Sequence, residues 1–382
     1  MIKLTSRFTV PQVFVNDHYI GGADDFKKFT GIFPENRKEE PKGDMSWFEE
    51  PAKVEETKLR PVQESERVVE LPTPPFLDKT DYVSLIKADR GSANDAKTPS
   101  VLNCLVSYKD RVDPNPIAVV HRLKKQLDKI IEKHRDDKQA VDYQAIKELD
   151  EFLEFEVATA ELQSVKLADM DDGVKKAFCI NLYNLMIKHA FTKVGVPTDK
   201  SNRGPFFTGV GYQLGEGYFT FDHLENGVLR SNRNGILKHE GDKRFAAIFP
   251  DSSVDCRIHF ALNCGAASCP PIKKFTSIAI DDELDVVARA YCEDEGNVKV
   301  EDGKVWVNQI FNWYGKDFGG NDEEKLRTIV QWCEGEKKIE VMKVIDEGGG
   351  IDYMVYDWGS DAREPVRSFE VGDAFKEMEW GE

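Results

Sequence analysis

Apolar residues recur at helical spacing along one stretch of the chain. They return every three or four positions between residues 117 and 131 and again between residues 143 and 157, which predicts two amphipathic helices. A third helix, predicted for residues 173–191, is apolar on nearly every side. Because such a helix is normally covered on most of its faces, we expect it to lie at the centre of the fold.

Shorter apolar runs separated by turn signals follow this helix. They predict strands at residues 218–221, 257–262 and 305–307, whereas residues 310–314 and 323–333 are again typical of helices. This mixture predicts the α+β class, with a helical N-terminal region packed on a mixed α/β core.

The N-terminal part of the chain has a different pattern. Residues 1–29 contain two short β-type runs around an Asn-Asp turn signal and then a predicted helix at residues 23–29. Residues 30–112 are acidic, rich in proline and poor in apolar anchors, so burial cannot offset their ordering entropy and we expect a largely disordered linker. The module that follows spans residues 113–382, with a helical lead-in up to residue 170 and an α+β core at residues 171–382.

Length and charge limit the class of function. The chain has 382 residues, enough for two or three domains, and a net charge of -17. That charge argues against nucleic acid or an anionic membrane as a partner. No apolar run approaches the roughly 20 residues that span a bilayer, and the opening residues lack the features of a secretory signal. The seven irregularly spaced cysteines favour reduced thiols, so we expect a cytoplasmic protein, with an organelle as the alternative.

The densest group of reactive side chains lies in the stretch DCRIHFALNCGAASCPP, residues 255–271. It contains His259, Asn263, Cys264 and Cys269. A strand end that breaks into a turn of small residues lets backbone N–H groups and short side chains converge on a bound group. We therefore place the candidate site here.

A cysteine nucleophile needs a lowered pKa and a base within reach. In a regular strand, His259 and Cys264 would point to opposite faces and lie roughly 16 Å apart, so His259 could not serve Cys264 without a bulge. Cys269 could fold back through the turn and approach either residue. We expect the base for Cys264 to come from another segment, with His223 and His189 as candidates.

Three interpretations of this cluster stay open. The first is a thiol-dependent enzyme in which Cys264 is the nucleophile, a histidine is the base, and Asn263 with turn amides holds an oxyanion. The second is a metal site of Cys264, Cys269 and His259, although a second ligand pair is absent from the sequence. The third is structural, because buried free cysteine is common and usually inert.

Four further residues are candidates to support the site. Asn181 and Asn184 share one stripe of the predicted central helix, where buried asparagines need defined partners. Their partners could be neighbouring loop backbone, so that the helix orients the site from beneath. Arg230 and Arg257 could pair with carboxylates or bind an anionic substrate.

The stretches AFCINLYNLMIKHAF, FDHLENGVLR, RIHFALNCGAASCPP, NWYGKDFG and IDYMVYDWGS resemble, in the same order, motifs of the domain-of-unknown-function 547 family. The resemblance covers roughly residues 115–375, and it implies no established reaction. Cys179 stands where the family usually has a tryptophan. Glu225 and Asn226 stand where it usually has Glu-His, so the resemblance assigns no general base there.

The segment TVPQVFVNDHYIGGADDF is similar to the C-terminal half of a glutaredoxin. The resemblance implies a truncated thioredoxin-like β-hairpin and helix, with Val10, Pro11, Gly22 and Asp24 at the positions that hold glutathione. The half that would carry Cys-x-x-Cys is missing from the sequence. We therefore expect a remnant, or a chain whose true start lies upstream, without glutaredoxin activity.

Taken together, these patterns predict a thiol-dependent hydrolase or acyl transferase that acts on a small molecule or peptide and requires no cofactor. The alternative is a non-catalytic interaction or scaffold domain with protein partners, fused to a degenerate segment of the glutathione-binding kind.

Overall fold

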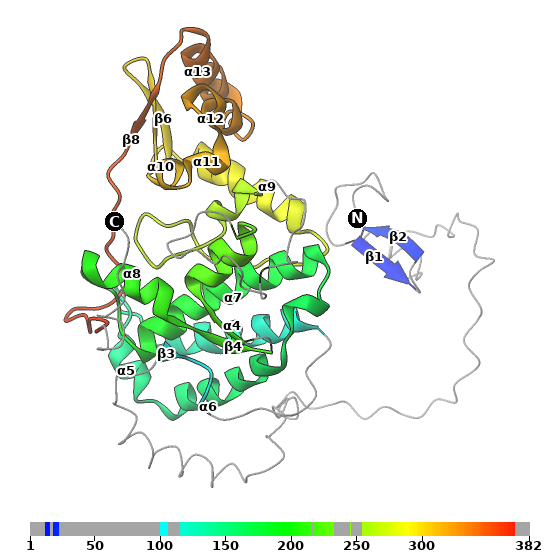
Figure 1. Ribbon diagram of the computed structural model, residues 1–382, viewed down its shortest axis with the longest axis vertical. Helices are drawn as coiled ribbons and strands as arrows, with labels where there is room; N and C mark the ends of the chain where they lie inside the picture. The colour runs from blue at the N-terminus through cyan, green and yellow to red at the C-terminus, as the bar shows by residue number, and fades with distance from the viewer. Residues whose placement is uncertain are drawn as a thin grey trace, which may run out of the picture. The chain divides into compact units, whose positions relative to one another are not determined.

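The structure is a computed structural model. It describes residues 12–15, 18–22, 100–105, 115–215, 217–232, 245 and 254–370. The chain divides into two compact units, residues 1–73 and residues 74–382. In the first unit, β1 (Gln12–Val15) pairs antiparallel with β2 (His18–Gly22), the blue hairpin of Figure 1. The predicted helix at residues 23–29 and most of the predicted linker lie outside the described residues.

The second unit mixes helices with short strands, so the α+β class is confirmed at that level. Its helices are α4 (Pro116–Glu132), α5 (Tyr143–Lys147), α6 (Asp150–Ala158), α7 (Asp172–Lys193), α8 (Lys200–Gly209), α9 (Ile280–Glu293), α10 (Ile310–Trp313), α11 (Gly315–Phe318), α12 (Asp322–Ile329) and α13 (Gly335–Asp346). Its strands are β3 (Ser100–Val101), β4 (Val210–Leu214), β5 (Gly217–Thr220), β6 (Val298–Glu301), β7 (Lys304–Val307) and β8 (Ile351–Tyr353).

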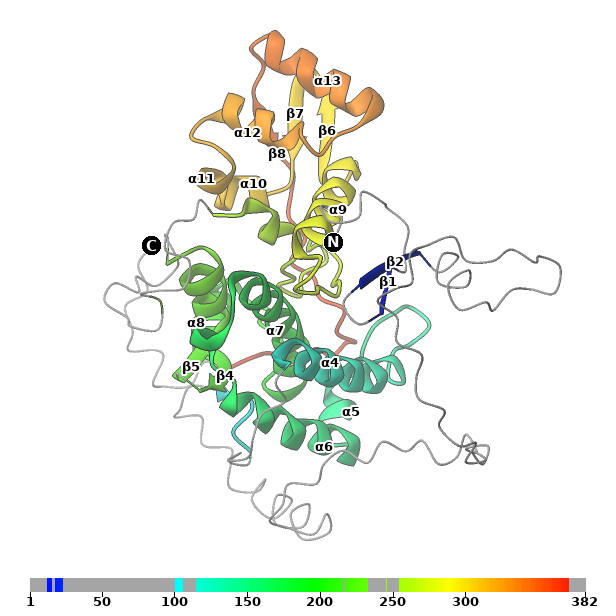
Figure 2. The same ribbon diagram turned by 90° about the vertical axis from the view of Figure 1, so that its right-hand side faces the viewer.

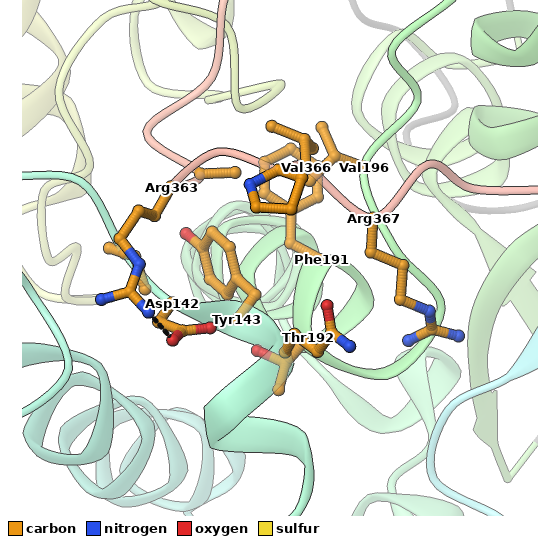
Figure 3. Close-up of a pocket in the computed structure, with 12 residues that line it drawn as sticks. Asp142, Tyr143, Phe191, Thr192, Val196, Arg363, Val366 and Arg367 are labelled. Atoms are coloured by element: carbon orange, nitrogen blue, oxygen red, sulfur yellow. Dashed lines mark hydrogen bonds and ion pairs between the residues drawn. The ribbon is translucent and has the colours of Figure 1, made fainter.

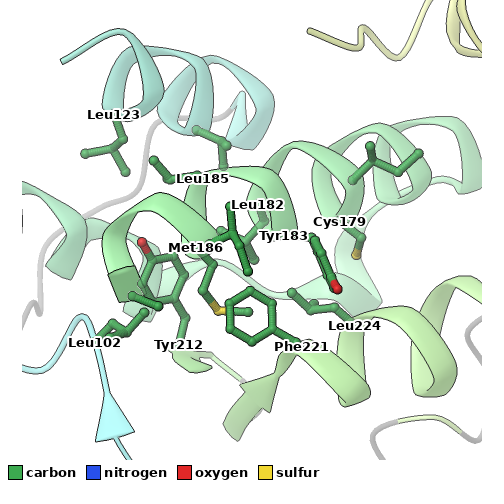
Figure 4. Close-up of a cluster of buried hydrophobic side chains, with 14 of the residues drawn as sticks. Leu102, Leu123, Cys179, Leu182, Tyr183, Leu185, Met186, Tyr212, Phe221 and Leu224 are labelled. Carbon is green, nitrogen blue, oxygen red and sulfur yellow. The ribbon is translucent and has the colours of Figure 1, made fainter. Parts of the chain in front are cut away.

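Helix α7 is central to this unit, as its pattern predicts. Sixteen of its 22 residues are buried. The Asp171 side chain begins the helix by accepting a hydrogen bond from the Val174 N–H. Figure 4 shows α7 side chains, among them Leu182 and Met186, packed against Tyr212 and other apolar residues from neighbouring elements. The elements that surround α7 therefore pack on it in one hydrophobic cluster.

The predicted helix over residues 143–157 is interrupted. Leu149 has extended backbone, with φ −79° and ψ 142°, and separates α5 from α6. The apolar face continues across the break, because Ile146 and Phe152 are both buried. The prediction is therefore correct for the buried face and wrong for the continuity of the helix.

The strands form two small sheets. In the order β3-β4-β5, β3 is parallel to β4 and β4 is antiparallel to β5. In the order β6-β7-β8, β6 is antiparallel to β7 and β7 is parallel to β8. These pairings include the predicted strands at residues 218–221 and 305–307 to within one or two residues.

The predicted strand at residues 257–262 is wrong. Cys256–Phe260 is a 3₁₀ helix that starts when the Asp255 carboxylate accepts the Arg257 N–H, and the Ala261 N–H then bonds to the Ile258 carbonyl. Local hydrogen bonds replace those of a sheet. A short apolar run by itself does not distinguish a buried strand from a buried helical turn.

Two hydrophobic clusters make up the core. One surrounds α4, α6, α7 and β4, and the other surrounds the β6-β7-β8 sheet with α9 to α13, which group together in Figures 1 and 2. Beyond β8, the chain returns from the second cluster to the first. There Ala362 bridges to Val141, Ser368 bridges to Val196, and Phe369 is buried. We call residues 354–370 the C-terminal strap.

The strap crosses a small cavity of about 20 Å³ beside α5 and the end of α7. Tyr143 and Phe191 line it from the helices, while Arg363 reaches from the strap to the Asp142 carboxylate (Figure 3). The space is enough for about one water molecule. No thiol lines it, so it is a packing gap beneath the strap rather than a site of cysteine chemistry.

Candidate functional site

Two asparagines of α7 hold the cysteine-bearing segment in place. The Asn184 side chain donates to the Ala261 carbonyl at 2.8 Å and accepts from the Asn263 N–H at 2.9 Å. Asn181 does the same for both backbone groups of Phe275, at 2.7 and 3.1 Å. Each amide thus pairs with one backbone donor and one backbone acceptor inside the core. Their role is to fix the two ends of the segment, with no free polar atom left for chemistry.

The turn itself is closed by Asn263. Its side chain accepts from the Gly265 N–H at 2.7 Å and donates to the Pro270 carbonyl at 2.7 Å. Gly265 has φ +88°, and a Cβ there would lie 2.3 Å from the Phe191 ring, so only glycine fits. Because both ends of the Asn263 amide are used inside the turn, we do not assign it the oxyanion role expected from the sequence.

The Cys269 sulfur lies among hydrogen-bond donors. It accepts the Cys264 N–H at 3.0 Å and contacts the Tyr356 hydroxyl at 3.1 Å. The Ala266 backbone also bonds to it. The Cys264 sulfur is 3.5 Å from the same Tyr356 hydroxyl. Backbone N–H groups that converge in a turn stabilise an anion, so this environment favours a thiolate at Cys269.

Tyr356 reaches the sulfurs because the strap binds to the turn. The Ala267 N–H donates to the Gly359 carbonyl at 2.6 Å, and the Ser268 N–H donates to the Asp357 carbonyl at 3.2 Å. Those turn amides, which the sequence suggested for an oxyanion hole, instead bind the strap.

The two thiols differ in protonation. A hydrogen bond with Cys269, together with burial, raises the pKa of Cys264 well above its usual value. Burial also opposes ionisation of Cys269, but hydrogen bonds from Cys264, Tyr356 and the turn backbone lower the pKa of Cys269 to about 7. Burial raises the pKa of Tyr356, so its hydroxyl stays protonated and acts as a donor. Near neutral pH, Cys269 is therefore the thiol that ionises.

His259 pairs with a buried carboxylate, that of Asp317. His259 Nε2 lies 2.8 Å from Asp317 Oδ2, and the imidazole stacks on Tyr314 with ring centroids 3.9 Å apart. Arg230 donates to both oxygens of Asp317, at 2.6 and 3.1 Å. Although burial raises the pKa of Asp317, hydrogen bonds from His259 and Arg230 lower it to about 2. An ionised carboxylate only accepts, so Nε2 carries the proton and Nδ1 is the ring atom left for proton transfer.

One cavity of about 370 Å³ brings these groups together. Cys264, Cys269, His259 and Arg230 all line it. Seven of its 18 lining residues are aromatic: Tyr183, Phe207, Phe221, Trp313, Tyr314, Tyr356 and Trp358. No hydrogen bond joins His259 to either sulfur among the described residues, so a bound molecule could lie between the imidazole and the thiols.

The structure changes the geometric argument about His259. Because residues 256–260 are helical and not extended, the alternation of faces that separated His259 from Cys264 does not apply. Both residues line one cavity.

The other histidines considered as bases lie elsewhere. His223 Nδ1 accepts the Thr220 N–H at 3.2 Å, and the residue does not line the cavity. His189 is fully buried, with Nδ1 2.8 Å from the Tyr212 hydroxyl, and burial lowers its pKa to about 4. His189 is thus a neutral core residue.

Arg257 ties the cysteine-bearing segment to α9. Its guanidinium donates to Asp255 at 2.8 Å, to Asp285 at 2.8 Å and to Asp281 at 3.0 Å. Lys176 adds a second cation on Asp255 at 2.8 Å. All of these partners are carboxylates of this chain, so Arg257 has a positioning role, whereas Arg230 lines the cavity.

Asp317, Tyr314 and Tyr356 are not among the site residues predicted from the sequence, where the aromatic residues of this region are expected mainly to pack the C-terminal core. They lie about 50 to 90 residues beyond the cysteines, so no local spacing connects them to the turn. The signal that could have found them was the presence of polar side chains inside the quoted stretches NWYGKDFG and IDYMVYDWGS.

Of the residues implied to hold glutathione, Val10, Pro11 and Asp24 lie outside the described residues, and Gly22 ends strand β2. The comparisons below show no glutaredoxin-like segment, and that resemblance stays a prediction. Across the described ranges, no group of three or more histidine, cysteine, aspartate or glutamate side chains is arranged so that it could hold a metal ion. No helix in the described part of the chain is long and apolar enough to cross a bilayer.

The comparison with protein families gives one match. The family described as "Protein of unknown function, DUF547" matches residues 167–292. This range includes α7 and the cysteine turn, but it is shorter than the resemblance over residues 115–375 and ends before Asp317 and Tyr356. Neither the curated proteins nor the solved structures gave a match.

Proposed function

We propose that this protein is a thiol-dependent hydrolase or acyl transferase for an amide or ester, with the Cys269 sulfur as the nucleophile. The observation that carries the proposal is the environment of that sulfur. It accepts the Cys264 N–H at 3.0 Å and contacts the Tyr356 hydroxyl at 3.1 Å, at the wall of a 370 Å³ cavity that His259 also lines. A stabilised thiolate next to space for a ligand is what nucleophilic catalysis requires.

In the first step, the Cys269 thiolate attacks the carbonyl carbon, a C–S bond forms, and the carbonyl electron pair moves to oxygen. We assign stabilisation of the developing oxyanion to the Tyr356 hydroxyl, a donor 3.1 Å from the attacking sulfur. The cycle starts with His259 protonated on both ring nitrogens. When the carbonyl re-forms, the C–N or C–O bond breaks, and His259 gives its Nδ1 proton to the leaving group and keeps the proton on Nε2. An acyl group remains on Cys269.

In the second step, His259 Nδ1 accepts a proton from water or from an acceptor amine or alcohol, which attacks the thioester. The C–S bond breaks, and the Cys269 thiolate is restored. Asp317 keeps Nε2 protonated and orients the ring through both steps, and Arg230 fixes Asp317 in turn. Because no imidazole touches the sulfur, donors of the turn and not His259 set the thiolate population.

The test combines alkylation with acylation. In native protein, iodoacetamide should modify Cys269 in preference to Cys264. The alkylation rate should reach half of its maximum at a pH of about 7, because the pKa of Cys269 is lowered to that value. A panel of activated aryl esters and anilides should leave an acyl group on the Cys269 peptide, detected by mass spectrometry. Cys269→Ala should remove both signals.

Two variants control this test. Cys256→Ala changes a cysteine that does not line the cavity, and it should leave acylation and alkylation unchanged. His259→Asn should slow turnover by about 10²- to 10⁴-fold while leaving the alkylation midpoint in place. The proposal fails if native Cys269 reacts no faster than a free thiol, or if no acyl group accumulates on it with any member of the panel.

A non-catalytic binding domain is the second candidate. The observation that favours it is the aromatic group at the cavity, where Trp313, Tyr356 and Trp358 pack with ring centroids 4.7 to 5.4 Å apart. Rigid aromatic walls suit binding whether or not chemistry follows. A ligand that binds Cys269→Ala and the native protein equally, without turnover, would support this candidate.

A further inference from the structure

Cys264 and Cys269 form a pair of reduced thiols at one wall of the cavity. Both sulfurs contact the same Tyr356 hydroxyl, at 3.5 and 3.1 Å, and a hydrogen bond joins the two thiols. The backbone N–H of Cys264 also points at the Cys269 sulfur. A disulfide needs two sulfurs that can approach to about 2 Å without large backbone movement, and this pair starts in contact.

The turn between them is already closed. The Asn263 side chain joins the Gly265 N–H to the Pro270 carbonyl, so it holds the chain before and after the two cysteines. A disulfide here would close a loop whose ends already meet, and little loop-closure entropy would be lost.

The pair also has the unequal protonation that oxidation needs. Hydrogen bonds from Cys264, Tyr356 and the turn backbone outweigh burial and lower the pKa of Cys269, whereas Cys264 keeps its proton. A thiolate attacks a peroxide, and a neighbouring thiol then resolves the product. The two roles fall on different cysteines.

Other cysteines of the chain lack this combination. None of the remaining five lines the cavity, and Cys179, Cys292 and Cys333 are buried. Burial raises the pKa of Cys256 to about 12. Cys104 is exposed, but partial desolvation raises its pKa as well. Selective oxidation at the pair therefore follows from access and ionisation together.

We propose that Cys264 and Cys269 are a peroxide-sensitive dithiol that closes reversibly to a disulfide. The Cys269 thiolate attacks one oxygen of a hydroperoxide, an S–O bond forms, the O–O bond breaks, and the remainder leaves as an alcohol, or as water from hydrogen peroxide, after taking a proton. Cys269 becomes a sulfenic acid. The Cys264 sulfur attacks it, an S–S bond forms, the S–O bond breaks, and the hydroxyl leaves as water with the Cys264 proton. Two electrons from the pair reduce one peroxide.

This modification does not depend on the proposed hydrolase activity, because it needs only the two sulfurs and access for a small oxidant. If Cys269 is the acyl-transfer nucleophile, the disulfide removes it and stops turnover until a thiol reductant restores the pair. If the acyl-transfer proposal fails, the disulfide can still be measured directly.

The experiment treats the fully reduced, full-length chain with hydrogen peroxide at neutral pH, blocks remaining thiols with N-ethylmaleimide and maps peptides by mass spectrometry. The expected product is a Cys264–Cys269 linked peptide that has lost two hydrogen atoms and is reversed by dithiothreitol. It should form at least about tenfold faster than Cys104 is oxidised, which serves as the internal comparison.

Variants assign the two steps. Cys264→Ala should stop at a sulfenic acid on Cys269 that dimedone traps, Cys269→Ala should abolish the fast reaction, and Cys256→Ala should behave as the native chain. Peptide mapping of the native chain shows whether the Cys264–Cys269 disulfide forms, even where a variant does not fold. The proposal is overturned if both thiols remain open to N-ethylmaleimide while Cys104 is oxidised, or if Cys269 pairs with a different cysteine.

Discussion

Cys264 and Cys269 are chemically identical, and only their surroundings make them unequal. The Cys264 N–H points at the Cys269 sulfur, the Ala266 backbone bonds to both sulfurs, and the Cys264 sulfur contacts the Cys269 thiol and the Tyr356 hydroxyl. Sequence spacing placed both cysteines at the site and favoured Cys264 as the nucleophile. The assignment to Cys269 depends on the direction of individual N–H bonds, which composition and periodicity do not contain.

Tyr356→Phe tests the contribution of the hydroxyl. The variant removes one donor from the Cys269 sulfur at 3.1 Å without changing the ring, so the pKa of Cys269 should rise from about 7 by up to about one unit, the size of a single charge-assisted hydrogen bond. The alkylation rate against pH should shift in the alkaline direction. Tyr353→Phe, which removes a hydroxyl that contacts Lys325, is the matched control and should not shift the profile.

Asp317→Asn tests the carboxylate between Arg230 and His259. Removing one partner of a buried pair leaves a buried charge uncompensated and should cost about 3–5 kcal/mol of unfolding free energy near neutral pH. The folded pKa of Asp317, about 2, is below the unfolded value of about 3.9, so its contribution is present above about pH 4 and is lost as pH falls towards 2.

Urea unfolding of the native protein and of Asp317→Asn, near pH 7 and near pH 3, measures their free energies of unfolding. The difference in unfolding free energy between the two proteins should be smaller at the lower pH. Asp322→Asn, at an exposed helix start, is the control and should change stability by less than about 1 kcal/mol. An Asp317→Asn protein as stable as the native one at neutral pH would contradict the assigned pairing.

At the element scale, the central helix and two of the short strands were predictable, whereas the break at Leu149 and the helical turn at residues 256–260 were not. Helix α7 was expected at residues 173–191 and spans Asp172–Lys193, because an apolar pattern of that length fits only a covered helix. The run at residues 257–262 was interpreted as a strand because its few residues carry no period. This run forms a 3₁₀ helix because Asp255 caps its first turn and Arg257 makes ion pairs with α9.

Asn184→Ala tests how α7 supports the turn. The variant leaves the Ala261 carbonyl and the Asn263 N–H without partners in the core, so the unfolding free energy should fall by about 2–4 kcal/mol. Selectivity of alkylation for Cys269 should fall with it, since the turn loses its fixed position. Asn312→Ala removes an exposed amide of α10 and should change stability by no more than about 0.5 kcal/mol. Equal effects of the two variants would contradict the positioning role.

At the scale of the second unit, the site exists only where three distant segments meet. The turn supplies the sulfurs, the junction between α10 and α11 supplies Tyr314, α11 supplies Asp317, and the C-terminal strap supplies Tyr356. Sequence spacing could indicate the first segment because its residues are neighbours in the chain. The other two segments reach the site through contacts between residues distant in sequence, because Asp317 pairs with His259 and the backbone of the strap bonds to the turn. No local pattern specifies such contacts.

Asp361→Asn tests whether the strap holds this arrangement together. Asp361 accepts hydrogen bonds from Lys188 of α7 at 2.9 Å and from the Tyr143 hydroxyl of α5 at 2.8 Å, so one carboxylate ties the strap to two helices. An amide keeps the shape but cannot balance the half-buried Lys188 charge, and the unfolding free energy should fall by about 1–3 kcal/mol. Because Tyr356 lies five residues earlier on the same strap, loosening the strap should also move the alkylation midpoint of Cys269 in the alkaline direction.

The control is Asp352→Asn, which alters a solvent-exposed pair with Lys304. It should change stability by less than about 1 kcal/mol and leave the midpoint unchanged. If Asp361→Asn loses stability while the midpoint stays fixed, the strap stabilises the fold without setting the reactivity of the thiol, and the turn alone must do so.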